Sequence, residues 1–173
     1  MDRQWKINDN LKKALKHGIL NIGFSGLAEC LKALTGEHQG ESKEAQKFGI
    51  KIVEFMRKKC DEYSEKYNLN FNLVATPKEE ISNKFIKMDQ AIYGKLKGIT
   101  DKNRYTNSFH IPEGYRISTE DKIKIEAQYH SLTNGGHIAI VQIKNGDTKD
   151  VINVIKTMKE NGIGYGKIVN MEK

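Results

Sequence analysis

The residues best suited to bind a ligand lie in one short stretch near the middle of the chain. Residues 105–112 read Tyr-Thr-Asn-Ser-Phe-His-Ile-Pro, which places Thr106, Asn107, Ser108 and His110 within five consecutive positions. In an extended strand Thr106, Ser108 and His110 share one face, because side chains alternate from side to side. Three uncharged polar groups on one face can hold a phosphate or the hydroxyls of a ribose. The alternative, a cluster of side chains that caps a turn before the proline, is equally open.

A second polar cluster follows about one helix later. Residues 132–138 read Leu-Thr-Asn-Gly-Gly-His-Ile and contain the candidate site residues Asn134, Gly135 and Gly136. Glycine tolerates positive φ and lets the backbone approach a ligand closely, so backbone N–H groups here could surround an anion. Asn-Gly and Gly-Gly are also common turn dipeptides, and by itself the cluster is better interpreted as a helix-to-strand turn. We expect both clusters to lie at strand ends and to face a ligand.

Chemistry beyond binding is scarce in this sequence. No nucleophile stands beside an evident base, and Glu29, Glu79 and Glu80 are expected to be surface residues. The five histidines have no metal-ligand spacing, and His38 is expected in an exposed loop. Gly-Phe-Ser-Gly at residues 23–26 precedes a predicted helix, but it lacks the Lys-Ser/Thr pair of phosphate loops and the dinucleotide-binding pattern. The residues alone therefore predict no metal site and no catalytic group.

Composition argues against several classes of protein. The chain has 173 residues, of which 29 % are charged and 38 % hydrophobic, and its formal net charge is +7. The sequence contains no run of about 18 apolar residues, which is the length needed to span a membrane. The N-terminus also has no apolar signal core, so we expect a cytoplasmic protein. Lysines are spread through the predicted helices and the arginines are scattered. This pattern favours a solvated basic surface over a nucleic-acid site.

Alternating helices and strands must position the two polar clusters. The expected helices are 9–17, 27–34, 42–67, 79–93, 118–132 and 148–161. The expected strands are 19–24, 71–75, 138–143 and 163–169, and residues 107–111 are expected to form a short strand or an extended segment. Ser42 and Ser118 are predicted N-caps, and Gly36 and Gly162 are predicted to end their helices. Helices that separate strands predict an α/β fold with crossover connections, in one unit over residues 1–173.

Apolar residues at spacings of three and four predict the buried faces of these helices. Phe55, Ile152 and Ile155 are expected to point inward. The two cysteines, Cys30 and Cys60, match no zinc or redox motif and are expected to be buried, free thiols. Free thiols fit a reducing compartment.

Six sequence blocks, in a fixed order, carry a family resemblance. They include His-Gly-Ile-Leu-Asn-Ile-Gly-Phe-Ser-Gly at the start of the first block, and the two polar clusters described above. The blocks are residues 17–40, 41–46, 63–77, 105–112, 132–137 and 162–165. In these blocks the chain resembles the anaerobic (class III) ribonucleoside-triphosphate reductases. The resemblance spans residues 17–165, which is nearly the whole chain.

The resemblance implies a fold and a reaction. That family uses a glycyl radical, made by a separate iron–sulfur activating enzyme, which passes to a cysteine that abstracts hydrogen from the ribose of a ribonucleoside triphosphate. Its fold is a ten-stranded α/β barrel of two half-barrels, and this chain resembles the later part of that barrel. Strands ending at Thr76 and Ile111, and one beginning at Gly136, would then be barrel strands. The residues implied to lie near the substrate are Thr106, Asn107, Ser108, His110, Asn134, Gly135 and Gly136.

Several motifs of the family have no counterpart in this sequence. We find no Arg-Val-Cys-Gly-Tyr-like glycyl-radical segment and no group of four zinc cysteines beside it. The half-barrel that carries the thiyl cysteine is also unmatched, and Cys30 is not given that role because it is predicted to lie in a core helix. We therefore expect that this chain holds neither the radical nor the zinc, and that it does not reduce ribonucleotides alone.

Three hypotheses for function follow. The first is a part of an anaerobic ribonucleoside-triphosphate reductase that helps to bind the triphosphate. Its partner would be the remaining reductase portion or a second copy, because an open half-barrel exposes strand edges. The second is a non-catalytic nucleotide-binding or regulatory module derived from that enzyme. The third is a basic nucleic-acid-binding domain, which the net charge permits but the scattered arginines do not favour.

Overall fold

Strands and helices alternate along the chain in the computed structural model, which describes residue 13 and residues 15–75, 79–144 and 147–171. The elements in chain order are β1 (Ile19–Phe24), α2 (Leu27–Thr35), α3 (Lys43–Tyr67), β2 (Asn70–Ala75), α4 (Glu79–Tyr93), α5 (Thr119–His130), β3 (Ala139–Lys144), α6 (Thr148–Glu160) and β4 (Gly166–Met171). The predicted α/β fold with helix-separated strands is therefore confirmed. The helix expected at residues 9–17 lies largely outside the described residues, as does the strand end at Thr76.

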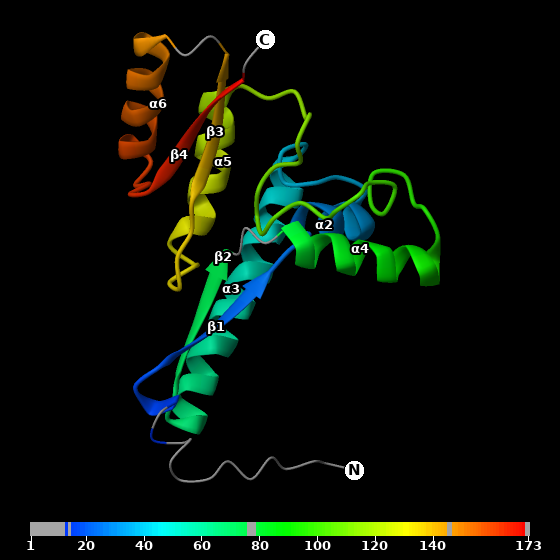
Figure 1. Cartoon of the computed structure of the whole chain (residues 1–173), viewed down its shortest axis with the longest axis vertical. Helices are drawn as coiled ribbons and strands as arrows, with labels where there is room; N and C mark the ends of the chain where they lie inside the picture. Colours follow the sequence, from blue (N-terminus) through cyan, green and yellow to red (C-terminus); the bar gives the residue numbers. More distant parts are fainter. Residues whose placement is uncertain (1–12, 14, 76–78, 145–146, 172–173) are drawn as a thin grey trace.

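The strands form two parallel pairs. Strand β1 pairs with β2, and β3 pairs with β4, each in parallel register. A single parallel bridge between Val74 and Gly136 links the β2 side to the chain just before β3, and an antiparallel bridge joins Ser25 to Asn107. Figure 1 shows the two pairs at opposite ends of an elongated molecule, with α3 along β1 and β2, and with α5 and α6 beside β3 and β4.

Local capping explains where the helices begin and end. The Ser42 hydroxyl accepts a hydrogen bond from the Ala45 N–H at 3.1 Å, and the Ser118 hydroxyl accepts one from the Asp121 N–H at 3.0 Å. Each bond satisfies an N–H that has no partner within its own helix. Gly36 ends α2 in the left-handed conformation with φ of 85°. The predicted caps of these helices are confirmed.

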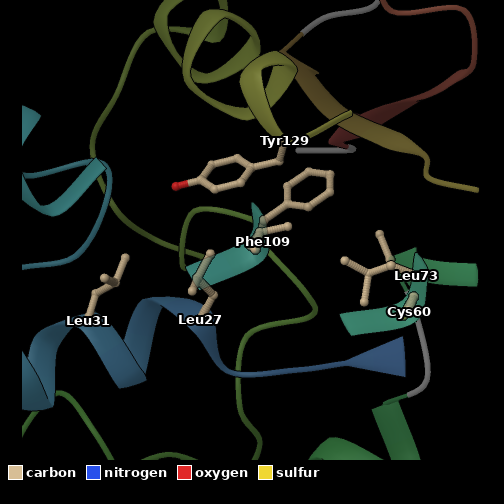
Figure 2. Packing of buried hydrophobic residues seen from close by; sticks show 8 residues of the cluster. Leu27, Leu31, Cys60, Leu73, Phe109 and Tyr129 are labelled. Carbon is tan, nitrogen blue, oxygen red and sulfur yellow. The ribbon is translucent and has the colours of Figure 1, made fainter. Parts of the chain in front are cut away.

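Two hydrophobic clusters hold the fold together. The first consists of Leu27, Leu31, Val53, Cys60, Leu73, Ala75, Phe109 and Tyr129. The second consists of Ile123, Ala139, Val141, Ile143, Val154, Met158 and Ile163. Figure 2 shows the ring of Tyr129 lying over that of Phe109, and their centroids are 5.2 Å apart with the planes only 10° from parallel. Burial of Phe109 contributes on the order of 2–3 kcal/mol and fixes the polar segment around it.

Some helix faces are less buried than their periodicity indicated. Cys30 is exposed, whereas Cys60 is buried as predicted. Phe55 is 61 % exposed, Ile152 is 44 % exposed and Ile155 is 54 % exposed, so the prediction that they point inward is wrong. Each helix packs along one side only, and apolar spacing does not reveal how wide that side is. Within the described residues, no helix is both long enough and apolar enough to cross a membrane.

Candidate functional site

The polar segment 105–112 is a clamped loop, and the prediction of a strand at residues 107–111 is wrong. The only bridge in this stretch of the described chain is at Asn107. Ser108 has φ of 47°, in the left-handed region, and the His110 N–H turns back to the Asn107 carbonyl at 3.0 Å. Thr106, Ser108 and His110 therefore do not line up on one strand face. We call residues 105–112 the wall segment.

Backbone bonds from the start of α2 hold the wall segment. The Gly26 N–H donates to the Thr106 carbonyl at 2.7 Å, and the Leu27 N–H donates to the Ser108 carbonyl at 3.3 Å. Gly26 has φ of 83°, and an added Cβ would lie 3.3 Å from the Tyr105 ring. A side chain at this position would therefore meet both strain and crowding.

The buried Gln39 holds the far end of the wall segment. Its amide nitrogen donates to the carbonyls of Phe109 and His110, both at 2.9 Å. Gln39 is 1 % exposed. Buried carbonyls need such partners, so this side chain fixes a loop that has no strand neighbours beyond Asn107 in the described structure.

Glu29 on α2 binds the beginning of the wall segment. The sequence predicted a surface residue, but Glu29 is 2 % exposed. Its carboxylate accepts from the Thr106 hydroxyl at 2.6 Å, from the Thr106 N–H at 3.2 Å and from the Lys102 ammonium at 2.7 Å. A charge can be buried here because hydrogen bonds and a cation compensate for lost water. These partners come from more than 70 positions away, so local sequence gives no signal for them.

Glu126 on α5 binds the other end. Its carboxylate lies 3.1 Å from Nδ1 of His110 and accepts from the Ile111 N–H at 2.9 Å. The Lys122 ammonium donates to it at 2.8 Å. Burial alone would raise the pKa of Glu126, but the hydrogen bond and charge of His110, together with Lys122, outweigh it and hold that pKa below its ordinary value. Sequence reasoning missed Glu126, although its four-residue spacing from Lys122 was a usable sign.

Two further contacts tie the wall segment to α4. The Ser82 hydroxyl donates to the Asn107 amide oxygen at 3.3 Å and lies 2.6 Å from the Ser25 hydroxyl. The Tyr105 hydroxyl donates to Asp89 at 2.6 Å. Burial, followed by the bond to Asp89, raises the pKa of Tyr105 far above its ordinary value, so the phenol keeps its proton. The segment is thus fixed by α2, α4 and α5 together.

A large open groove runs along the wall segment. Its volume is about 1830 Å³, and it extends from the start of α4 to β3 and α6. Three predicted site residues, Thr106, Asn107 and His110, line it. The cationic side chains of its lining are Lys102, Arg104, Arg116 and Lys122. Ser108 is 1 % exposed and lies outside this lining.

The second predicted cluster lies elsewhere and has a structural role. The Asn134 amide oxygen accepts from the Leu73 N–H at 3.0 Å, and the Gly135 N–H donates to the Leu73 carbonyl at 2.7 Å. Gly136, with φ of 121°, accepts from the Ala75 N–H at 3.0 Å. Asn134, Gly135 and Gly136 thus fasten the turn after α5 onto β2, and none of them lines the groove. The alternative interpretation as a helix-to-strand turn describes this geometry.

The structure also contradicts the prediction for His38, and it shows two neighbouring histidines, His130 and His137. His38 was expected to be exposed, but it is 4 % exposed and meets the Tyr115 ring edge-on at 4.6 Å. His130 and His137 have ring centroids 3.9 Å apart. Both ring nitrogens of His130 are buried without a hydrogen-bond partner among the described residues, and burial, then the neighbouring His137, lowers the pKa of His130 to about 4.

In the described part of the chain, no group of three or more His, Cys, Asp or Glu side chains could hold a metal ion. Glu79 and Glu80 are exposed, as predicted. What the groove offers is binding chemistry: an amide, a hydroxyl and an imidazole, fixed by two buried carboxylates.

The fold and the groove define an α/β segment of helix-separated parallel strands with a clamped polar wall. The chain belongs to the anaerobic ribonucleoside-triphosphate reductase family, whose model matches residues 1–171. It is 36 % identical to the enzyme of Salmonella typhimurium over 143 residues, which is 81 % of this chain and 20 % of that protein. It is also 36 % identical to the Escherichia coli enzyme over 141 residues, again 20 % of the relative. The chain thus spans about a fifth of the length of these relatives.

Solved structures show the same fold. An anaerobic ribonucleotide reductase superposes with a TM-score of 0.76 over 90 % of this chain and 25 % of its own, at 18 % identity. The Thermotoga maritima enzyme with dATP bound in its specificity site superposes with a TM-score of 0.73 over 89 % of this chain and 26 % of its own, also at 18 % identity. The expected likeness to part of a reductase is confirmed at the level of the fold.

Proposed function

We propose that this chain forms part of an anaerobic ribonucleoside-triphosphate reductase and that its wall segment contributes to triphosphate binding. One observation carries the proposal: Thr106, Asn107 and His110 line a single large groove, where buried carboxylates hold Thr106 and His110 and the Ser82 hydroxyl holds Asn107. Fixed polar groups bind better than mobile ones, because little conformational freedom is lost on binding. Family membership supports the proposed class of reaction, and the groove supports the proposed location of the binding site.

Each of the three side chains has a polar atom left over to form a hydrogen bond with a ligand. The Thr106 hydroxyl donates its hydrogen to Glu29, which leaves its oxygen to accept from a ribose hydroxyl. The Asn107 oxygen is held by Ser82, and its amide nitrogen, which makes no hydrogen bond to a described residue, has two donors for phosphate or ribose oxygens. His110 uses Nδ1 toward Glu126, so Nε2 is the ring nitrogen that remains.

The proposal assigns binding and positioning to this chain and leaves the radical chemistry to the rest of the enzyme. The family's glycyl radical abstracts hydrogen through a cysteine, and neither cysteine of this chain lines the groove. In this proposal the chain alone binds nucleotides without reducing them. Asn134, Gly135 and Gly136 act indirectly, because they hold the α5–β3 turn whose helix carries Glu126.

Calorimetry tests the binding claim directly. Ribonucleoside triphosphates are titrated into the chain and into the Asn107→Ala variant, with Asn170→Ala as a matched control at an exposed position of β4. Losing one hydrogen bond to a charged group weakens binding by about 1.5–3 kcal/mol, or roughly tenfold or more. Asn170→Ala should bind like the wild type. Identical heats for wild type and Asn107→Ala contradict the assignment.

A further inference from the structure

Helix α4 turns an apolar stripe toward solvent. Ile81, Phe85, Met88 and Ile92 follow one another at helical spacing on one face and are 43 %, 48 %, 53 % and 69 % exposed. The residues that α4 buries are instead Ser82 and Ile86. Tyr93 and Leu96, just beyond, are 66 % and 45 % exposed. We call Ile81, Phe85, Met88 and Ile92 the α4 stripe.

Polar contacts, rather than this stripe, attach α4 to its own chain. Asp89 accepts from the Tyr105 hydroxyl, and Gln90 donates to the carbonyls of Thr100 and Lys102. Glu79, at the start of the helix, accepts from Arg104 at 2.7 Å. These contacts fix the position of the helix while the stripe keeps roughly half of its surface exposed.

An apolar surface of this extent indicates a binding partner. Soluble monomers rarely expose contiguous apolar patches larger than a few hundred Å², and four large apolar side chains on one helix face exceed what isolated surface residues require. Lys84, Lys87 and Lys95 are exposed along the same helix and just after it, and Glu80, four residues before Lys84, is exposed too. The surface thus combines an apolar centre with a basic rim.

We propose that the α4 stripe is the surface on which the remaining portion of a reductase of this family docks, through an apolar face with an acidic rim. This inference rests on the proposed function. The chain covers 20 % of the length of its Salmonella and E. coli relatives, so most of a reductase of that size lies outside this segment. A partner of that kind meets both the apolar stripe and the lysines beside it.

A second copy of this chain fits the stripe less well. In a symmetric pair the same patch meets itself, so Lys84 and Lys87 of one copy would approach the same residues of the other. The helix has 15 residues, about two heptads, which is shorter than the three or four heptads that mark a coiled coil. The lysines therefore select an acidic partner.

Two hydrogen bonds connect helix α4, the proposed docking helix, to the groove. Ser82 and Asp89 lie on α4 and bind Asn107 and Tyr105 of the wall segment. A partner that fixes α4 therefore also fixes the groups that line the groove. Figure 1 shows α4 at the side of the molecule, apart from the β3–β4 pair.

Thiol labelling tests the docking surface. In a Cys30→Ser background, Met88→Cys is placed in the chain alone and in a chimera, the E. coli relative with its matched 141 residues replaced by this chain. Lys159→Cys, at an exposed position of α6 outside the stripe and its neighbouring lysines, is the control. Met88→Cys should react at least about tenfold more slowly in the chimera than in the chain alone, since labelling requires access to the thiol. Lys159→Cys should change by less than about twofold.

Equal rates for Met88→Cys in the chain and in the chimera overturn the proposal. Rapid labelling of Cys60 in the chimera shows that the segment does not assemble with that enzyme, and overturns it too. Concentration-dependent protection of Met88→Cys in the chain alone identifies a second copy as the partner and also overturns it. If Met88→Cys is protected in the chimera but Asn107→Ala leaves the heat of triphosphate binding unchanged, docking is supported and the nucleotide site is refuted.

A second variant asks whether the chain covers the stripe itself. Phe85→Lys in the chain alone should leave the thermal midpoint unchanged within about 2 °C, because a surface substitution rarely changes stability by more than about 0.5 kcal/mol. In the chimera the same substitution should lower the midpoint by several degrees. A drop of similar size in the chain alone places the stripe within its own core and overturns the proposal.

Discussion

The buried carboxylate of Glu126 lies 3.1 Å from Nδ1 of His110. It also accepts the Ile111 N–H, and its partner Lys122 donates to the Ile140 carbonyl of β3 at 2.8 Å. The paired side chains of Glu126 and Lys122 on α5 therefore connect the wall segment to the second strand pair. The geometry of the groove and the stability of the fold therefore depend on the same pair of side chains, and one substitution can be used to measure both effects.

Removing Glu126 should destabilise the protein strongly. Glu126→Ala leaves Lys122 and the His110 ring without their buried partner, a loss of about 3–5 kcal/mol for a broken buried pair. Glu120→Ala is the matched control, because Glu120 pairs with Lys124 in solvent and such exposed pairs add little to stability. Urea unfolding measures both. Comparable losses in the two variants would show that Glu126 is not the junction described here.

Stability should fall in mild acid because of His130. Its pKa is about 4 in the folded chain, against an ordinary value of 6.5. Below pH 6.5 His130 binds a proton in the unfolded chain but not in the folded chain. The free energy of unfolding therefore decreases as pH falls from 6.5 to about 4. The loss is at most about 3–4 kcal/mol, at about 1.4 kcal/mol per pKa unit. The His137 pKa is also lowered by burial and acts in the same direction.

The His130→Phe variant isolates this effect. It should flatten the fall in unfolding free energy between pH 6.5 and 4, leaving the smaller part due to His137. Below that range Glu126 takes over, because a carboxyl with a lowered pKa loses its stabilising charge as pH falls through the folded value. A wild-type unfolding free energy that stays constant from pH 7 to 5 contradicts the burial of the histidine pair.

Gly135 should tolerate no side chain. A Cβ there would lie 2.9 Å from the Leu73 carbonyl oxygen and 3.1 Å from the Asn21 amide oxygen. Backbone must move to admit it, which costs about 1–3 kcal/mol. Gly164→Ala is the matched control, since nothing lies within 4 Å of its Cβ position. Thermal unfolding of both variants decides: similar midpoints would mean that the turn does not pack on β2 as described.

The two cysteines should label very differently. Cys30 is exposed and Cys60 is 3 % exposed. Burial raises the pKa of both thiols, so reaction at pH 7 is slow and faster at pH 8.5. Cys30 should still react at least about a hundredfold faster in the folded protein, because Cys60 needs local opening. Mass spectrometry after labelling shows which thiol carries the tag, and early modification of Cys60 would argue against the first hydrophobic cluster.

Local patterns predicted the elements well where neighbours in sequence determine them. Ser42 and Ser118 cap their helices as predicted, and the bounds of α4 agree with the predicted residues 79–93. Capping and helical periodicity act within a few residues, so a single sequence contains their signal.

The site was harder to predict because its partners are remote. Glu29 looked like a surface residue, and its burial depends on Lys102 and Thr106 far along the chain. Thr106, Asn107 and His110, which were predicted to lie near a substrate, all line the groove, but the expected strand face is replaced by the turn at Ser108. Tertiary hydrogen bonds set that turn, and no local pattern encodes them.

Activity of the chimera tests the central claim most directly, since there the wall segment can meet substrate within a complete enzyme. Formation of deoxyribonucleotide from a ribonucleoside triphosphate is measured for the chimera, for its Asn107→Ala variant and for Asn170→Ala. The account predicts turnover by the chimera, a fall in kcat/KM of at least about tenfold for Asn107→Ala, and little change for Asn170→Ala. A chimera that turns over substrate equally well with Asn107→Ala would show that the wall segment does not touch the nucleotide.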